Sequence, residues 1–123
     1  MREVQIDELM GKELVEVGFD VDASSERFMG NIAMFEKFLK KFPADPNYTR
    51  LEEAVGNGQP EAALSAAHTL KGVCGNLSMI PLHGLLAKQV EHIRADDWKT
   101  AVGVMKDIRR EYEKVNAALA KLP

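Results

Sequence analysis

The sequence lacks most of the features that mark secreted or membrane-bound proteins. Its single cysteine, Cys74, rules out a disulfide within the chain, and a free thiol is ordinary in a reducing cytoplasm. No segment approaches the roughly 20 apolar residues that a membrane-spanning helix needs. The first 18 residues carry charges throughout and lack the apolar run of a signal peptide. We therefore expect a cytoplasmic protein without a membrane segment.

An excess of positive charge is also absent. The 123 residues include 16 basic and 19 acidic side chains mixed along the chain, for a net charge of −3. Nucleic-acid binding needs a basic stripe or patch, so a nucleic-acid partner is not expected. With 46% apolar and 28% charged residues, the composition is typical of a soluble globular protein. The length fits one domain spanning residues 1–123.

Signatures of metal and nucleotide binding are missing as well. His83 and His92 are nine residues apart, which is not a ligand spacing on a helix, and no HExxH or paired-cysteine pattern accompanies them. The chain has no GxxxxGK[ST] motif, so it should not phosphorylate itself. We expect no metal site and no bound cofactor, and we interpret Cys74 as a buried small apolar residue.

The sequence does have apolar residues at helical spacing along nearly its whole length. Alternating strand patterns are absent, which predicts an all-α fold. Capping residues and turns divide residues 31–123 into helices over about 31–42, 46–55, 60–77, 81–94 and 98 to the C-terminus. Because the connections are short, we expect the four longer of these helices to pack as an up-and-down antiparallel four-helix bundle, with the helix over 46–55 a short one and short extra N-terminal helices over residues 1–30 as a lid.

The periodic apolar positions also predict which side chains form the core. The expected core residues are Phe28, Ile32, Phe35, Phe38, Leu39, Phe42, Tyr48, Leu51, Val55, Leu82, Leu85, Leu86, Val90, Ile93, Trp98, Ala101, Val102, Met105, Ile108, Tyr112, Val115 and Leu119. With its apolar faces covered in this way, the bundle should be monomeric.

One histidine lies outside this pattern. On an ideal helix over 60–77, with about 100° per residue, Leu70, Val73 and Leu77 fall nearly opposite His68. The core therefore lies behind the histidine, and we expect its imidazole to face solvent. A neutral imidazole, with an ordinary pKa of about 6.5, is a nucleophile near neutral pH, and its Nε2 projects farthest from the backbone.

The same helix contains two glycines after the histidine, in the stretch HTLKGVCGNL. Together they cost about 2 kcal/mol relative to alanine. Gly72 and Gly75 fall on the face of His68, where their lack of bulk would let another protein approach. Gly75 could instead serve a close helix crossing, because small residues also permit tight packing. Leu64 and Ser65, one turn before the histidine, complete this face, and a partly exposed Leu64 would suit a docking surface.

Lys71 adds a cation one turn after His68. An ammonium group on a flexible stem can reach an anion on the imidazole, and lysine serves phosphate well as a point charge. A nucleophilic ring, a mobile cation and a surface without bulk therefore occupy one helix face.

These residues carry a resemblance to a known family. The string HTLKG, followed by glycine and asparagine, resembles the signature of histidine phosphotransfer (HPt) domains of two-component phosphorelays. The earlier segment FDVDASSERFMGNIAMFEKFLKKF looks like the leading segment of that family, and Leu82, Leu85 and the pair Val90-Glu91 fall about where its leucines and acidic position lie. The resemblance covers roughly residues 18–97.

Two positions depart from the family pattern. Ser78 stands where the family often has glycine, and Gln59 replaces the usual aspartate before the signature helix. Neither belongs to the reacting groups, so these departures bear on where the helices end.

The resemblance implies that His68 accepts the phosphoryl group at Nε2, that Lys71 stabilises it and that Gly72 keeps the site open. It implies a phosphoryl carrier that is not itself an enzyme. Its expected partners are response-regulator receiver domains and hybrid histidine kinases, with Mg²⁺ held by the receiver. Two other hypotheses stay open: a helical adaptor that docks such domains without phosphotransfer, and a metal- or haem-binding bundle.

Overall fold

A computed structural model describes residues 32–121, with side chains from residue 34 onward, and every regular element in that range is a helix. These are α3 (Ile32–Lys41), the short 3-10 helix η1 (Phe42–Ala44), α4 (Asn47–Gly56), α5 (Pro60–Asn76), α6 (Ile80–Arg94) and α7 (Trp98–Leu119). The predicted all-α class is confirmed. The helices expected over residues 1–30, with Phe28, and the side chain of Ile32 lie outside the described residues.

Two helices begin next to a side chain that accepts a hydrogen bond from the first turn, and a third begins at a proline. The Asp45 side chain accepts hydrogen bonds from the backbone and side-chain nitrogens of Asn47, at 2.9 and 2.8 Å, where α4 begins. Asp97 accepts a bond from the backbone nitrogen of Thr100 at 3.3 Å and so caps α7. Gln59 makes no capping bond through its side chain, and α5 nevertheless begins at Pro60, because proline is favoured in the first turn.

The turn between α5 and α6 contains Ser78, one of the two positions that depart from the HPt pattern. Ser78 is buried and has a φ of 55°, in the left-handed region that glycine adopts without cost. A residue with a Cβ is less stable in that conformation by about 1 kcal/mol. The turn thus has the geometry for which glycine is the favoured residue.

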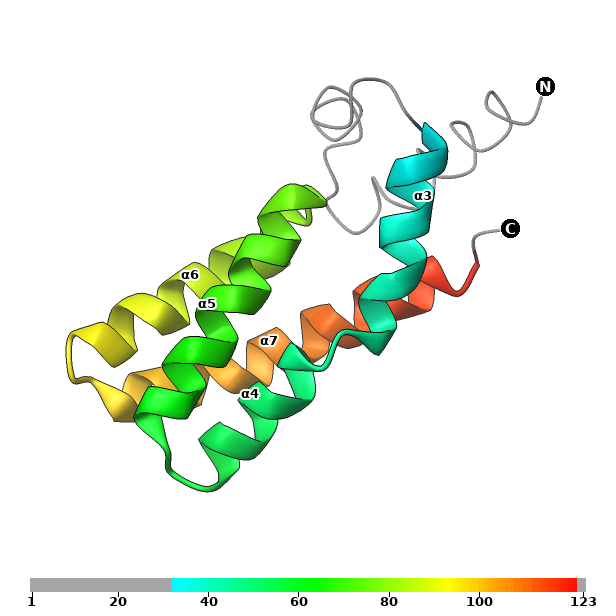
Figure 1. Ribbon diagram of the computed structural model, residues 1–123. Helices are drawn as coiled ribbons and strands as arrows, with labels where there is room; N and C mark the ends of the chain where they lie inside the picture. Colours follow the sequence, from blue (N-terminus) through cyan, green and yellow to red (C-terminus); the bar gives the residue numbers. More distant parts are fainter. Residues whose placement is uncertain (1–31, 122–123) are drawn as a thin grey trace.

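Four helices contact one another in a ring, and they include the short helix expected over 46–55 in place of the longer one expected over 31–42. α5 packs against α4 and α6, α6 packs against α7, and α7 returns to contact α4. Each connection between them is three residues long, at 57–59, 77–79 and 95–97. Figure 1 shows α5 and α6 side by side, α4 next to α5, and α3 leading into α4 and extending beyond it.

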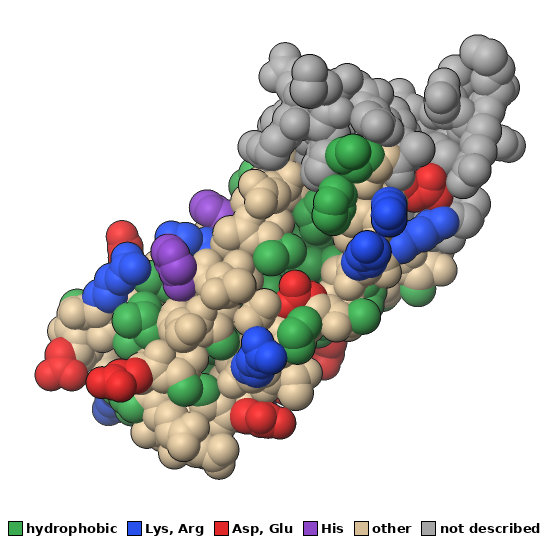
Figure 2. Space-filling model, viewed as in Figure 1, with side chains coloured by type: hydrophobic (Ala, Val, Ile, Leu, Met, Phe, Trp, Pro, Cys, Tyr) green, Lys and Arg blue, Asp and Glu red, His purple; other side chains and the backbone are tan. Residues whose placement is uncertain are grey.

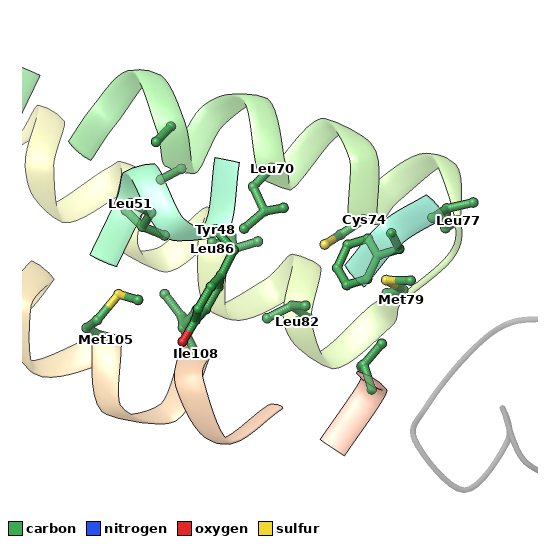
Figure 3. Close-up of a cluster of buried hydrophobic side chains, with 14 of the residues drawn as sticks. Tyr48, Leu51, Leu70, Cys74, Leu77, Met79, Leu82, Leu86, Met105 and Ile108 are labelled. Atoms are coloured by element: carbon green, nitrogen blue, oxygen red, sulfur yellow. The ribbon is translucent and has the colours of Figure 1, made fainter. Parts of the chain in front are cut away.

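The core lies inside this ring. Figure 3 shows Leu70 and Cys74 pointing from α5 into the cluster, toward Leu82 and Met79. The buried hydrophobic residues are Phe35, Leu39, Phe42, Tyr48, Leu51, Ala54, Ala63, Ala66, Ala67, Leu70, Cys74, Leu77, Met79, Leu82, Leu86, Val90, Ala101, Val104, Met105, Ile108, Val115, Ala118 and Leu119. Other predicted core residues are partly buried against this cluster, namely Val55, Leu85, Ile93, Trp98 and Tyr112.

Two predicted core residues are exposed. Phe38 is 44% exposed and lines an apolar pocket between α3 and α5, at the flank of the face that buries Phe35 and Leu39. Val102 is 38% exposed. It follows the buried Ala101 by one residue, which turns its side chain about 100° away from the core. In both cases the apolar pattern of the sequence is wider than the face that is buried.

A polar and aromatic junction joins α4 to α7. The rings of Tyr48 and Tyr112 stack with centroids 3.6 Å apart and planes within 2°. Next to them, Arg109 Nε donates to Glu52 Oε1 at 2.7 Å, and Tyr48 Oη donates to the same oxygen at 3.0 Å. The hydrogen bond from Arg109 holds the pKa of Glu52 below its ordinary value.

Candidate functional site

The exposure of His68 follows from the composition of α5. Ala63, Ala66, Ala67, Leu70 and Cys74 form the buried side of this helix. His68 and the following Thr69 are exposed. The prediction that the core lies behind the histidine is confirmed. Val73, which was predicted to face the core, is half-buried and lines the pocket beside α3.

The imidazole of His68 is not engaged by its neighbours. Within residues 34–121, neither of its ring nitrogens has a hydrogen-bond partner. Lys71, one turn later, is half-buried, and its ammonium group forms no ion pair with any side chain in the same range. Both groups can therefore interact with a ligand or partner without first breaking a hydrogen bond or an ion pair to another described residue.

Gly72 borders open space. A Cβ built on it would meet nothing within 4 Å, and the residue is exposed. Ser65 is exposed as well, whereas Leu64 is half-buried with part of its side chain packed on the core. Within residues 34–121, therefore, no neighbouring atom stands where a side chain at position 72 would begin.

The surroundings of Gly75 are different. A Cβ there would lie 3.3 Å from Cδ2 and 3.5 Å from Nε2 of His83, so the space above this glycine already holds a ring from α6. This agrees with the alternative interpretation of Gly75 as a site of close helix packing, and the residue packed against it is His83. The sequence pattern suggested only a test of His83 as a metal ligand, and this contact was not predicted. A signal was available, because a tight turn centred on Ser78 brings residues on either side of it together.

Cys74 and His92 both have roles inside the fold. Cys74 is fully buried, as predicted, and burial raises the pKa of its thiol to about 12. His92 lies 3.1 Å from Asp97 through Nδ1, at the junction between α6 and α7. Within the described part of the chain, no three His, Cys, Asp or Glu side chains gather in a way that could hold a metal ion.

Figure 2 shows histidine side chains on the surface over α5 and α6, with Lys and Arg side chains nearby; apolar and further basic side chains lie near α3. Among residues 32–121, no helix is long and apolar enough to span a membrane.

Comparisons with known proteins add one finding. A family model described as the Hpt domain matches residues 33–118, a range that begins at the second residue of α3 and ends within α7. It contains His68, Lys71, Gly72 and Gly75. Neither the search of curated proteins nor that of solved structures gave a match.

Proposed function

Because the chain belongs to the Hpt domain family and so has a role related to phosphoryl transfer in two-component phosphorelays, we propose that it is a phosphoryl carrier using His68. The observation that carries this proposal is an exposed imidazole, without an internal hydrogen-bond partner in the described range, next to open space at Gly72. A phosphoryl carrier needs its acceptor atom accessible to a second protein, and His68 meets that requirement.

The transfer step needs little from this chain beyond position and charge. In the tautomer that carries its proton on Nδ1, the lone pair of Nε2 attacks the phosphorus of a receiver aspartyl phosphate in line. The bond from phosphorus to Nε2 forms as the bond to the aspartate oxygen breaks, and the carboxylate leaves with the electron pair. The reverse step returns the group to the aspartate of another receiver domain.

Lys71 and Gly72 support this step in different ways. The Lys71 ammonium group is one turn from His68 and can place a positive charge near the oxygens of the phosphoryl group. Gly72 lets the receiver surface come close to the imidazole. We propose that Mg²⁺ belongs to the receiver and that this chain needs no cofactor and acts as substrate and carrier, without a kinase activity of its own.

The form of the molecule that performs this role is also part of the proposal. The ring of contacts and the three-residue connections support an up-and-down antiparallel bundle formed by α4, α5, α6 and α7. We propose that it works as a monomer in the cytoplasm, and that response-regulator receivers and hybrid histidine kinases bind over the His68 face.

The test is transfer from a receiver domain that carries a radiolabelled phosphoryl group. We expect the wild-type chain to take up label that is stable in alkali and lost in acid. The variant His68→Gln should take up none. His92→Gln serves as the control, because His92 lies in the last turn of α6 and pairs with Asp97 inside the fold. Docking of the receiver without any label would favour the adaptor and refute the carrier.

A further inference from the structure

His83, near the start of α6, reaches over the face of α5 that carries His68. Its ring atoms Cδ2 and Nε2 lie 3.3 and 3.5 Å from the position of a Cβ at Gly75. Gly75 follows His68 by seven residues, which on an ideal helix is a rotation of about 20° and a rise of about 10 Å. The second imidazole is therefore on the same face as the first, about two turns along.

The ring of His83 packs against Gly75, but among the described residues no polar group pairs with its nitrogens. The side chain is half-buried. Within residues 34–121, neither ring nitrogen has a hydrogen-bond partner. A side chain already restricted by packing loses little conformational entropy when it binds a partner. Its two nitrogens remain available for a hydrogen bond to another molecule.

The other half-buried histidine on the same helix makes a useful contrast. His92 lies in the last turn of α6 and has a structural partner, the Asp97 carboxylate at 3.1 Å. His92 therefore has an evident role within the fold. The packing of His83 against Gly75 would be equally possible for an apolar ring. It therefore does not explain why this position has a side chain with two polar ring atoms.

The surface next to His83 is open to a second protein. Ile80, one turn earlier on α6, is 56% exposed. Gly84, the next residue, is exposed, and a Cβ on it would meet nothing within 4 Å. An exposed apolar side chain and an exposed glycine therefore lie close to His83 in the sequence of α6, and the ring of His83 contacts the α5 face that carries His68.

We propose that His83 is a specificity-determining residue, whose imidazole donates a hydrogen bond to a carbonyl or carboxylate oxygen of the receiver domain docked over His68. Gly75 leaves room for this ring, because a Cβ there would lie 3.3 Å from His83 Cδ2 and the ring would have to shift. This inference rests on the proposed carrier function. It assigns the second glycine of α5 to the placement of His83, whereas Gly72 serves direct access to His68.

The experiment measures single-turnover transfer from a phosphorylated receiver domain, which gives a maximal rate constant and a half-saturating receiver concentration (KM), with the dissociation constant of the unphosphorylated receiver measured in parallel. We expect His83→Ala to raise KM and the dissociation constant about 3- to 10-fold, the range for one lost hydrogen bond, with the maximal rate constant unchanged. His83→Leu, which restores bulk, should behave like alanine. His83→Gln, which keeps an N–H donor, should recover most of the affinity. His92→Gln is the matched control on the same helix.

A second pair of variants tests the role of Gly75. Gly75→Ala should raise KM when His83 is present and should have no further effect in the His83→Ala background, because the two residues act through one contact. Gly103→Ala is the control, since that helical glycine on α7 is exposed and has open space around its Cβ position. If Gly75→Ala impairs transfer equally in both backgrounds, Gly75 serves access alone and the inference is wrong.

The failures of the two proposals are distinguishable. Unchanged KM and affinity in His83→Ala, or wild-type behaviour in His83→Leu, overturn the role of His83 while leaving the carrier intact. If every variant still takes up label, His68→Gln included, the carrier proposal itself is overturned. If the chain docks receivers without taking label, the dissociation constants of the His83 variants still decide whether this histidine contributes to recognition. Absence of both label and docking contradicts both proposals.

Discussion

Replacing Gly72 should change stability and phosphotransfer in opposite directions. Gly72 is an exposed residue in the interior of α5, and a Cβ there would meet no atom within 4 Å. Alanine at such a position is favoured over glycine by about 1 kcal/mol. For a domain of 123 residues, this gain corresponds to a rise in Tm of about 3–5 °C.

The magnitude depends on the surroundings of each glycine. Gly75→Ala should give a smaller gain than Gly72→Ala, because its Cβ would lie 3.3 Å from the His83 ring and that ring would have to shift. Gly103→Ala, in open space on α7, should match Gly72→Ala in stability. Calorimetry on the three variants provides the comparison. A loss of stability in Gly72→Ala would refute the conclusion that this glycine has no structural role.

The functional cost appears with a larger side chain. Leucine has a helix propensity close to that of alanine, so Gly72→Leu should also be at least as stable as the wild type. Its side chain would screen His68 from a receiver, and we expect the transfer rate to fall at least about tenfold, equivalent to about 1.4 kcal/mol in the activation free energy. A wild-type transfer rate in Gly72→Leu would contradict the idea that the glycine keeps the site open.

Further predictions concern the core and the junction between α4 and α7. The Cys74 thiol, whose pKa burial raises to about 12, should react with a thiol reagent only after unfolding, and rapid modification of the native protein would contradict its burial. Leu82→Ala should cost about 2–5 kcal/mol in the free energy of unfolding, because the side chain is fully buried, and a cost below about 1 kcal/mol in denaturant titrations would show that the core is packed differently. Glu52, whose pKa is lowered mainly by the Arg109 hydrogen bond, contributes stability that is present above its unfolded-state pKa and is lost as the pH falls through the folded-state pKa. Melting curves between about pH 7 and pH 3 should therefore show a larger acid loss for the wild type than for Glu52→Gln, and equal losses would contradict this ion pair's role.

The helices and the orientation of His68 could be predicted because both depend on local periodicity. The apolar residues of α5 recur on one side, so the side on which the histidine lies follows from its position in the helix. The limits of that argument appear at Phe38 and Val102, which lie at the flanks of buried faces. How wide a buried face is depends on how closely the neighbouring helix approaches, and a single helix pattern does not contain that information.

The contact between Gly75 and His83 could not be read from either helix alone. It depends on the register of α5 against α6, which the turn at residues 77–79 determines. Ser78 illustrates the same point, since its left-handed backbone became evident only with the turn geometry. The comparison with the family pattern had already marked this position as unusual. Residues that matter through tertiary contacts are the ones that sequence periodicity leaves undetermined.

The central claim is that His68 carries the phosphoryl group, and the most direct measurement is to locate that group on the chain. The protein is phosphorylated by a receiver domain, kept at alkaline pH and fragmented under conditions that preserve phosphohistidine. The account predicts one phosphoryl group per chain, on Nε2 of His68. A phosphoryl group on His83 or on any other residue, with His68 unmodified, would contradict it.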